Sequence, residues 1–212
     1  AGIVLLAILG LFIVKNRLKW LILTDTVLAI LLSFGRHFPL ISDLFFDYFP
    51  MYNKFRAVES ILVIPAVLIP ILAVLTINEL IVRGNEIPKL DKTILYTGGA
   101  VAAVCLIVAL MPSVLDLRTS QHQQYVAQLQ QMVQDQNIAN ELSNALLKDR
   151  ADLASKDAWR SFIIVALTIG LVWAFVKKKL SASILIAAIA VITLVDLWTV
   201  DKRYLNNDAF VD

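Results

Sequence analysis

The segment DYFPMYNKFRA carries the side chains best suited to bind a ligand, because an amide and two cations stand close together in it. Asn53, Lys54 and Arg56 immediately precede a long apolar run. Lysine and arginine bind phosphate oxygens through charge-assisted hydrogen bonds, and the start of a helix adds free N–H groups and partial positive charge. The sequence therefore predicts an anion site for a phosphate or another lipid headgroup. The alternative is that both cations reach ordinary lipid phosphates.

Carboxylates stand near this anion site, and general acid–base catalysis would need one of them. Asp43, Asp47 and Glu59 are the candidates, and nothing in their spacing distinguishes one as a base. The chain has one cysteine, Cys105, and two histidines. This composition excludes an intrachain disulfide and offers little for a zinc centre, so we expect neither a metal site nor a cofactor.

The elements that hold these residues must be membrane helices. Of the 212 residues, 59% are hydrophobic and 17% are charged, and the mean hydropathy is +0.76. Soluble domains are about 45–50% apolar and about 25% charged. This apolar excess is too large for one core to bury, which argues against a soluble enzyme and against a protein that binds nucleic acid.

Six apolar runs approach the length of about 20 residues that a helix needs to cross a bilayer. The six runs are residues 1–14, 18–34, 61–82, 93–111, 161–176 and 180–198. They predict an all-α fold, a polytopic transmembrane helical bundle of about six spans. Asp25, Glu79 and Asp196 are expected near the ends of their spans, and Gly98 and Gly99 are expected to permit close helix approach.

The distribution of lysine and arginine predicts the orientation of the spans. Residues 15–19, 83–92 and 177–179 carry nine of the 19 cations in 18 residues. The other connections carry ten cations over 89 residues. Since basic loops stay in the cytoplasm, the three dense loops are predicted to lie inside, and the long connections and both ends outside.

Two long connections interrupt the predicted spans. Residues 35–60 form an aromatic outer loop, in which positions 38–55 hold seven of the 19 aromatic residues. Residues 112–160 form a glutamine-rich insert, whose apolar residues recur at helical spacing. We expect the insert to be an extracytoplasmic helical hairpin that lies on the membrane or on another part of the protein. Its second helix should run from Ile138 into the fifth span.

The resulting organisation has four parts. Residues 1–111 hold spans one to four with the outer loop, residues 112–160 form the insert, residues 161–198 hold spans five and six, and residues 199–212 form an outer tail. The chain starts with Ala1 inside an apolar run. We therefore expect an internal piece of a longer polytopic protein, with the tail leading to a further domain.

Three segments in a fixed order resemble the YfhO-type family of bacterial membrane proteins. They are DYFPMYNKFRA, LLKDRADLASKDAWRSF and VDLWTVDKRYLNND, and the resemblance extends from about Asp43 to Asp212. Members are similar to the GT-C class of glycosyltransferases. The resemblance implies a multi-pass protein of the bacterial cytoplasmic membrane that transfers a sugar from a polyprenyl-phosphate donor to an envelope acceptor on the outer face.

Under this resemblance, Lys54 and Arg56 suit the donor phosphate, with Asn53 as a polar neighbour. The catalytic carboxylate of the class usually lies in a first outer loop that this sequence does not contain. Two other functions stay open from the residues: a non-catalytic scaffold that binds a partner protein through the outer hairpin, and a transporter of a lipid-linked substrate. Membrane lipids are expected partners in every case.

Overall fold

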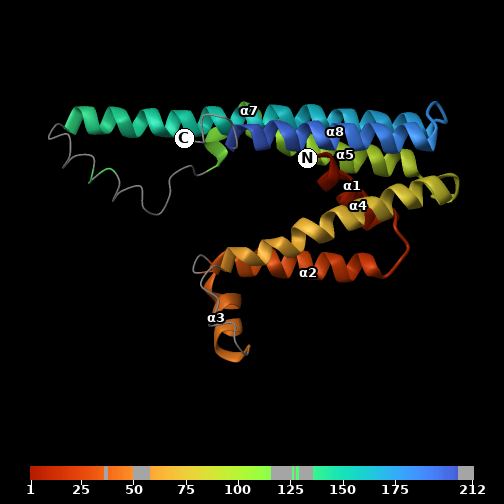
Figure 1. Ribbon diagram of the computed structural model, residues 1–212, viewed down its shortest axis with the longest axis horizontal. Coiled ribbons are helices and arrows are strands. Elements are labelled where there is room, and N and C mark those ends of the chain that lie inside the picture. The colour runs from red at the N-terminus through yellow and green to blue at the C-terminus, as the bar shows by residue number, and fades with distance from the viewer. Residues whose placement is uncertain (36–37, 50–57, 116–125, 127, 129–135, 205–212) are drawn as a thin grey trace, which may run out of the picture. The chain divides into compact units, whose positions relative to one another are not determined.

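The computed structural model describes residues 1–35, 38–49, 58–115, 126, 128 and 136–204 (Figure 1). Every regular element among these residues is a helix, which confirms the all-α prediction. The α-helices are α1 (Gly2–Ile13), α2 (Leu18–Ser33), α3 (Pro39–Tyr48), α4 (Val63–Arg83), α5 (Leu90–Leu110), α7 (Gln136–Val176) and α8 (Ala182–Tyr204). Short 3-10 turns are η3 (Val58–Leu62), η4 (Gly84–Glu86) and η5 (Pro112–Val114).

Four helical segments are long and apolar enough to cross a membrane. They are Ser60–Arg83, Leu90–Leu110, Asn137–Val176 and Ala182–Arg203. They correspond to predicted spans three to six and make the chain a membrane-embedded helical protein. Helices α1 and α2 have 12 and 16 residues, which is shorter than the usual span of about 20 residues.

The described helices fall into two compact units, Ala1–Thr97 with Thr168–Asp212, and Gly98–Leu167. In the first unit, α1 packs mainly against α4 and touches α8 and α2 more lightly. Its core joins α1, α2, α4 and α8 to the first turns of α5 and the last turns of α7. Members of this core with almost no exposure are Leu6, Leu80, Val172 and Leu185.

A glycine brings α1 and α4 close together. A Cβ atom added to Gly10 would overlap Thr76 Oγ1 and would lie 3.3 Å from the Leu72 side chain. Small residues allow membrane helices to approach in this way. The same role predicted for Gly99 is wrong, because no atom lies within 4 Å of the position its Cβ would take.

The second unit contains the end of α5 and the polar first half of α7. Helix α7 is a single helix of 41 residues, so the predicted continuation from Ile138 into the fifth span is confirmed. The Ser155 hydroxyl donates a hydrogen bond of 2.7 Å to the carbonyl of Ala109. This bond satisfies one of the carbonyls that the end of α5 leaves without a helical partner. Most of the predicted first helix of the hairpin lies outside the described residues.

Candidate functional site

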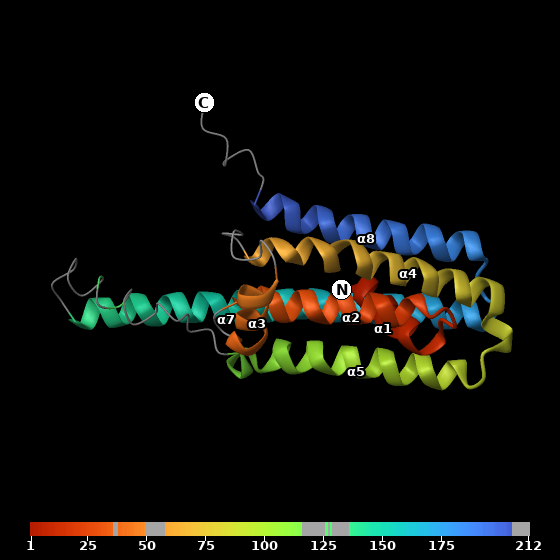
Figure 2. The ribbon, with the colours of Figure 1, turned by 90° about the horizontal axis from the view of Figure 1, so that it is seen from below.

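The predicted anion site, Asn53, Lys54 and Arg56, lies outside the described residues, so its geometry stays a prediction. The structure does describe both flanks, α3 before it and η3 with α4 after it. Helix α2 contacts α3 and η3 and also packs along α4. Because α2 and α4 run in opposite directions (Figure 2), both flanks lie where α2 ends and α4 begins.

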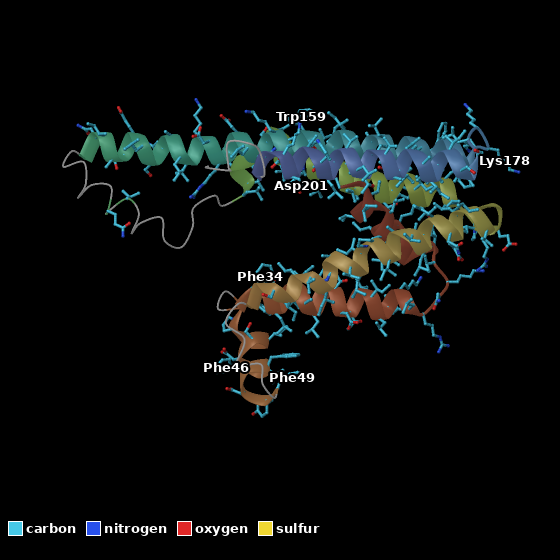
Figure 3. The ribbon with its side chains drawn as sticks, in the orientation of Figure 1. Phe34, Phe46, Phe49, Trp159, Lys178 and Asp201 are labelled. Carbon is cyan, nitrogen blue, oxygen red and sulfur yellow. The ribbon has the colours of Figure 1, made fainter. Side chains whose placement is uncertain are left out.

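The upstream flank is a short aromatic helix. Pro39 at the start of α3 fits a helix beginning, because its missing N–H would have no intrahelical partner there. No residue of α3 is fully buried. The rings of Phe45 and Phe49 stack with centroids 5.4 Å apart, while Phe46 and Tyr48 are exposed. Figure 3 shows Phe34 at the end of α2, with Phe46 and Phe49 farther along the chain, at the end of α3 away from α2.

Such a helix has the composition of one that lies in a membrane interface, where aromatic rings are enriched. Two of the candidate carboxylates belong to it. Asp43 and Asp47 are both exposed, and their i,i+4 spacing places them on one face of α3, one turn apart. Glu59 lies in η3 on the downstream flank. Of the three candidates, Asp43 and Asp47 therefore belong to the upstream flank of the predicted anion site and Glu59 to the downstream one.

The acidic residues within the apolar helices differ in their surroundings. Glu79 accepts a hydrogen bond of 3.0 Å from Arg83 one turn later, near the end of α4 as expected. Asp25 does not lie near a helix end, because α2 starts at Leu18 and ends at Ser33, so Asp25 occupies its middle. The prediction for Asp25 is therefore wrong: α2 has nearly the predicted bounds of 18–34, and in a helix this short a residue two turns from the start is already at the middle.

Among the residues that the structure describes, no cluster of three or more histidine, cysteine or acidic side chains could hold a metal ion. The sequence did not predict an ion pair at the end of the first unit where α7 ends and α5 begins. There Lys177 of the α7–α8 turn forms an ion pair of 2.7 Å with Asp91 of α5. The signal was present in the sequence, because residues 177–179 are all lysine, but it indicated only which side the loop occupies.

Comparison of the chain with protein-family models, with curated proteins and with solved structures finds no match.

Proposed function

We propose that the chain is the membrane part of a bacterial envelope glycosyltransferase with a polyprenyl-phosphate-linked sugar donor. The donor phosphate binds at Asn53, Lys54 and Arg56, on the outer face of the cytoplasmic membrane. Helices α1 and α2 complete six spans with the four longer helices, and both ends of the chain lie outside. This proposal rests on the resemblance of the sequence to the YfhO-type family and on the placement of charge in the first unit.

One observation carries the proposal: the flanks of the anion site lie at the end of the α2–α4 pair opposite the dense basic loops. In the first unit, the loops with Lys15, Arg83 and Lys177 lie at the same end of the helices (Figures 1 and 2). Lys54 and Arg56 precede α4 in sequence, and the described segments that flank them lie at the opposite end, where the connections are predicted to carry few cations. Cations that the positive-inside rule does not explain require another reason, and phosphate binding supplies one.

The chemistry assigned to these cations is stabilisation of the leaving group. A hydroxyl oxygen of the acceptor attacks the anomeric carbon of the sugar, and the bond from that carbon to the phosphate oxygen breaks. The polyprenyl phosphate leaves with the bonding electrons, and its negative charge is stabilised by Lys54 and Arg56. A carboxylate takes the proton of the attacking hydroxyl. Glu59 in η3 and Asp47 on α3 are the candidate carboxylates nearest in sequence to the cations, and Asp43 lies one turn before Asp47.

The direct test measures sugar transfer in membranes that contain the full-length protein. Lys54→Ala and Arg56→Ala should each lower transfer at least tenfold and raise the donor concentration needed for half-maximal rate. Lys148→Ala removes an exposed cation of α7 and serves as the matched control, with unchanged transfer. Normal transfer in both site variants, at equal protein levels, would refute the proposed site.

The proposed topology has a separate test by cysteine accessibility. In a Cys105→Ser background, Tyr48→Cys places a thiol on α3, and Lys178→Cys places one in the α7–α8 turn. A membrane-impermeant maleimide should label Tyr48→Cys in intact cells and Lys178→Cys only after permeabilisation. Labelling of both positions from outside contradicts the six-span arrangement.

The long α7 favours a second candidate function, a non-catalytic scaffold. A helix of 41 residues is about 60 Å long at 1.5 Å per residue, twice the hydrocarbon thickness of about 30 Å. Its first half is polar and exposes Ile138, Leu142 and Leu153, side chains that a partner protein could cover. Crosslinking from Leu142 that recovers a partner, with transfer intact in Lys54→Ala, favours this candidate.

A further inference from the structure

At the end of the first unit that carries the basic loops, α5 and α7 border a groove of about 210 Å³. Its apolar wall consists of Ile94 and Leu95 from α5 and Ile169 and Trp173 from α7. Its charged rim consists of Asp91, Lys92 and Lys177. An apolar wall that ends at a charged rim matches the division of a phospholipid into acyl chain and headgroup.

Two further lysines, next to Lys177 of the rim, close the end of α7. The amide of Lys178 donates to the carbonyl of Phe175 at 2.8 Å, and the amide of Lys179 donates to that of Ala174 at 2.9 Å. With Lys178 at a φ of 58°, this is the Schellman arrangement that closes a helix. Glycine normally occupies that left-handed position. The chain instead has a lysine there.

The ring of Trp173 lies close to two lysines of this turn. The Nζ atoms of Lys177 and Lys179 lie 5.8 and 6.0 Å from the centroid of its ring, within range of a cation–π interaction. The ring is half exposed and lines the groove, as tryptophan does at the boundary between acyl chains and headgroups. Two ammonium groups therefore lie close to the indole that lines the groove.

We propose that the α5–α7 groove binds one anionic phospholipid, with an acyl chain along Ile94, Leu95 and Ile169 and the phosphate between Lys92 and Lys177. Basic pockets between membrane helices bind anionic headgroups in this way. Asp91 competes with the phosphate for Lys177, because their ion pair is half exposed and can open. The groove is smaller than the pockets of about 300–1,000 Å³ that enclose a whole ligand, so it holds only part of the lipid.

The ordinary role of these lysines would be to reach the phosphates of any lipid around the helix ends. Two properties separate a built site from that role. A site prefers an anionic phospholipid to a zwitterionic one, and it depends on the lysines of the rim more than on a neighbouring lysine outside it. Lys178 provides that comparison, because it belongs to the same turn but does not line the groove.

The test uses the full chain in phosphatidylcholine vesicles, with Trp173 as the reporter. Trp20→Phe, Trp159→Phe and Trp198→Phe leave it as the single tryptophan of the chain. Brominated phosphatidylglycerol should quench Trp173 at a several-fold lower mole fraction than brominated phosphatidylcholine. Equal quenching by the two lipids overturns the proposal, and so does relief of quenching by millimolar inorganic phosphate, which would indicate a site for a free anion.

Charge variants locate the site within the turn. Lys92→Gln combined with Lys177→Gln should weaken phosphatidylglycerol binding about 25-fold, at about fivefold per lysine, whereas Lys178→Gln should change it less than twofold. A loss of about fivefold in Lys178→Gln, the same loss per lysine as in the double variant, would show general electrostatic attraction and overturn the proposal. Asp91→Asn checks folding and mechanism together, because it removes the competitor of the phosphate and keeps both lysines. It should strengthen binding, and weaker binding would show that the Asp91–Lys177 pair is structural and that no phosphate replaces it.

Discussion

Helices α1 and α8 are both apolar, yet the first unit buries most of one and leaves most of the other exposed. In α1, seven of the 12 residues are buried, among them Leu5, Leu6, Leu9 and Ile13, whereas Phe12 is exposed. Only 11% of the apolar window of α8 is buried. The same kind of sequence therefore builds a central helix in one place and a peripheral helix in another.

The difference shows that hydropathy does not determine which apolar helix of a membrane protein packs closely against its neighbours. Lipid tails are as apolar as leucine, so an apolar side chain gains little from exchanging lipid for protein. What distinguishes α1 is its fit to α4, where Gly10 leaves room for Leu72 and Thr76. Close packing adds many weak dispersion contacts, and these are the interactions that α8 mostly lacks.

The largest effect should come from shortening a buried leucine of α1. Leu6→Ala removes a side chain with no exposed surface and leaves a cavity, so the free energy of unfolding in detergent should fall by about 2–5 kcal/mol. Leu194→Ala on α8 is the matched control, because Leu194 is 66% exposed. It should change the unfolding free energy by less than about 0.5 kcal/mol. Similar losses at both positions would contradict the contrast between the two helices.

The next effect concerns the close contact rather than the buried surface. Gly10→Ala forces Thr76 and Leu72 to move, and overpacking of this kind costs about 1–3 kcal/mol. Gly170→Ala on α7 makes the same change where no atom lies within 4 Å, so it should be neutral or stabilising. Thr76→Ala should restore part of the stability lost in Gly10→Ala. Denaturation of the three variants in detergent, followed by circular dichroism, measures these differences.

Much of this fold could be predicted from residue types, and the limits of that prediction follow the same contrast. Apolar length identified the helices at 61–82, 93–111, 161–176 and 180–198, because a bilayer sets a minimum length for a span. The partners of each helix could not be predicted, since contact depends on shape. Nothing in the sequence distinguishes Gly10 from Gly99 as a helix contact. Of these two glycines, only Gly10 lies against a neighbouring helix.

The candidate sites also show that contacts between distant residues could not be predicted from the sequence. Lys54 and Arg56 could be identified as site candidates because two adjacent cations in a predicted outer loop depart from the positive-inside rule. Lys177 lies in a loop that is predicted to be cytoplasmic, as the positive-inside rule requires, so its sequence position does not indicate a further role. Its ion pair with Asp91 joins residues 86 positions apart, and only folding brings them together. Lys177 thus contributes both to the orientation of its loop and to an ion pair with Asp91, and only the first of these could be predicted from the sequence.

A smaller effect is expected where α8 begins. Because α8 has few contacts, the turn before it should contribute a larger share of its attachment. The Ser181 hydroxyl accepts a hydrogen bond from the amide of Ile184 at 3.4 Å, which is the position of an N-cap. Ser181→Ala should lower the unfolding free energy by about 0.5–1 kcal/mol. Ser183→Ala, two residues later and outside the cap, should leave it unchanged, and equal effects would argue against capping.

The smallest effect should have the opposite sign, at the end of α7. Lys178 holds a left-handed backbone conformation with φ of 58°, so Lys178→Gly should raise the unfolding free energy by about 0.5 kcal/mol. Lys179→Gly removes the same charge without relieving that conformation, and it should not stabilise the chain. If both variants stabilise equally, repulsion among the three lysines is the cause. If only Lys178→Gly does, the left-handed backbone conformation of Lys178 is the cause, because Lys179→Gly removes the same charge and leaves that conformation in place.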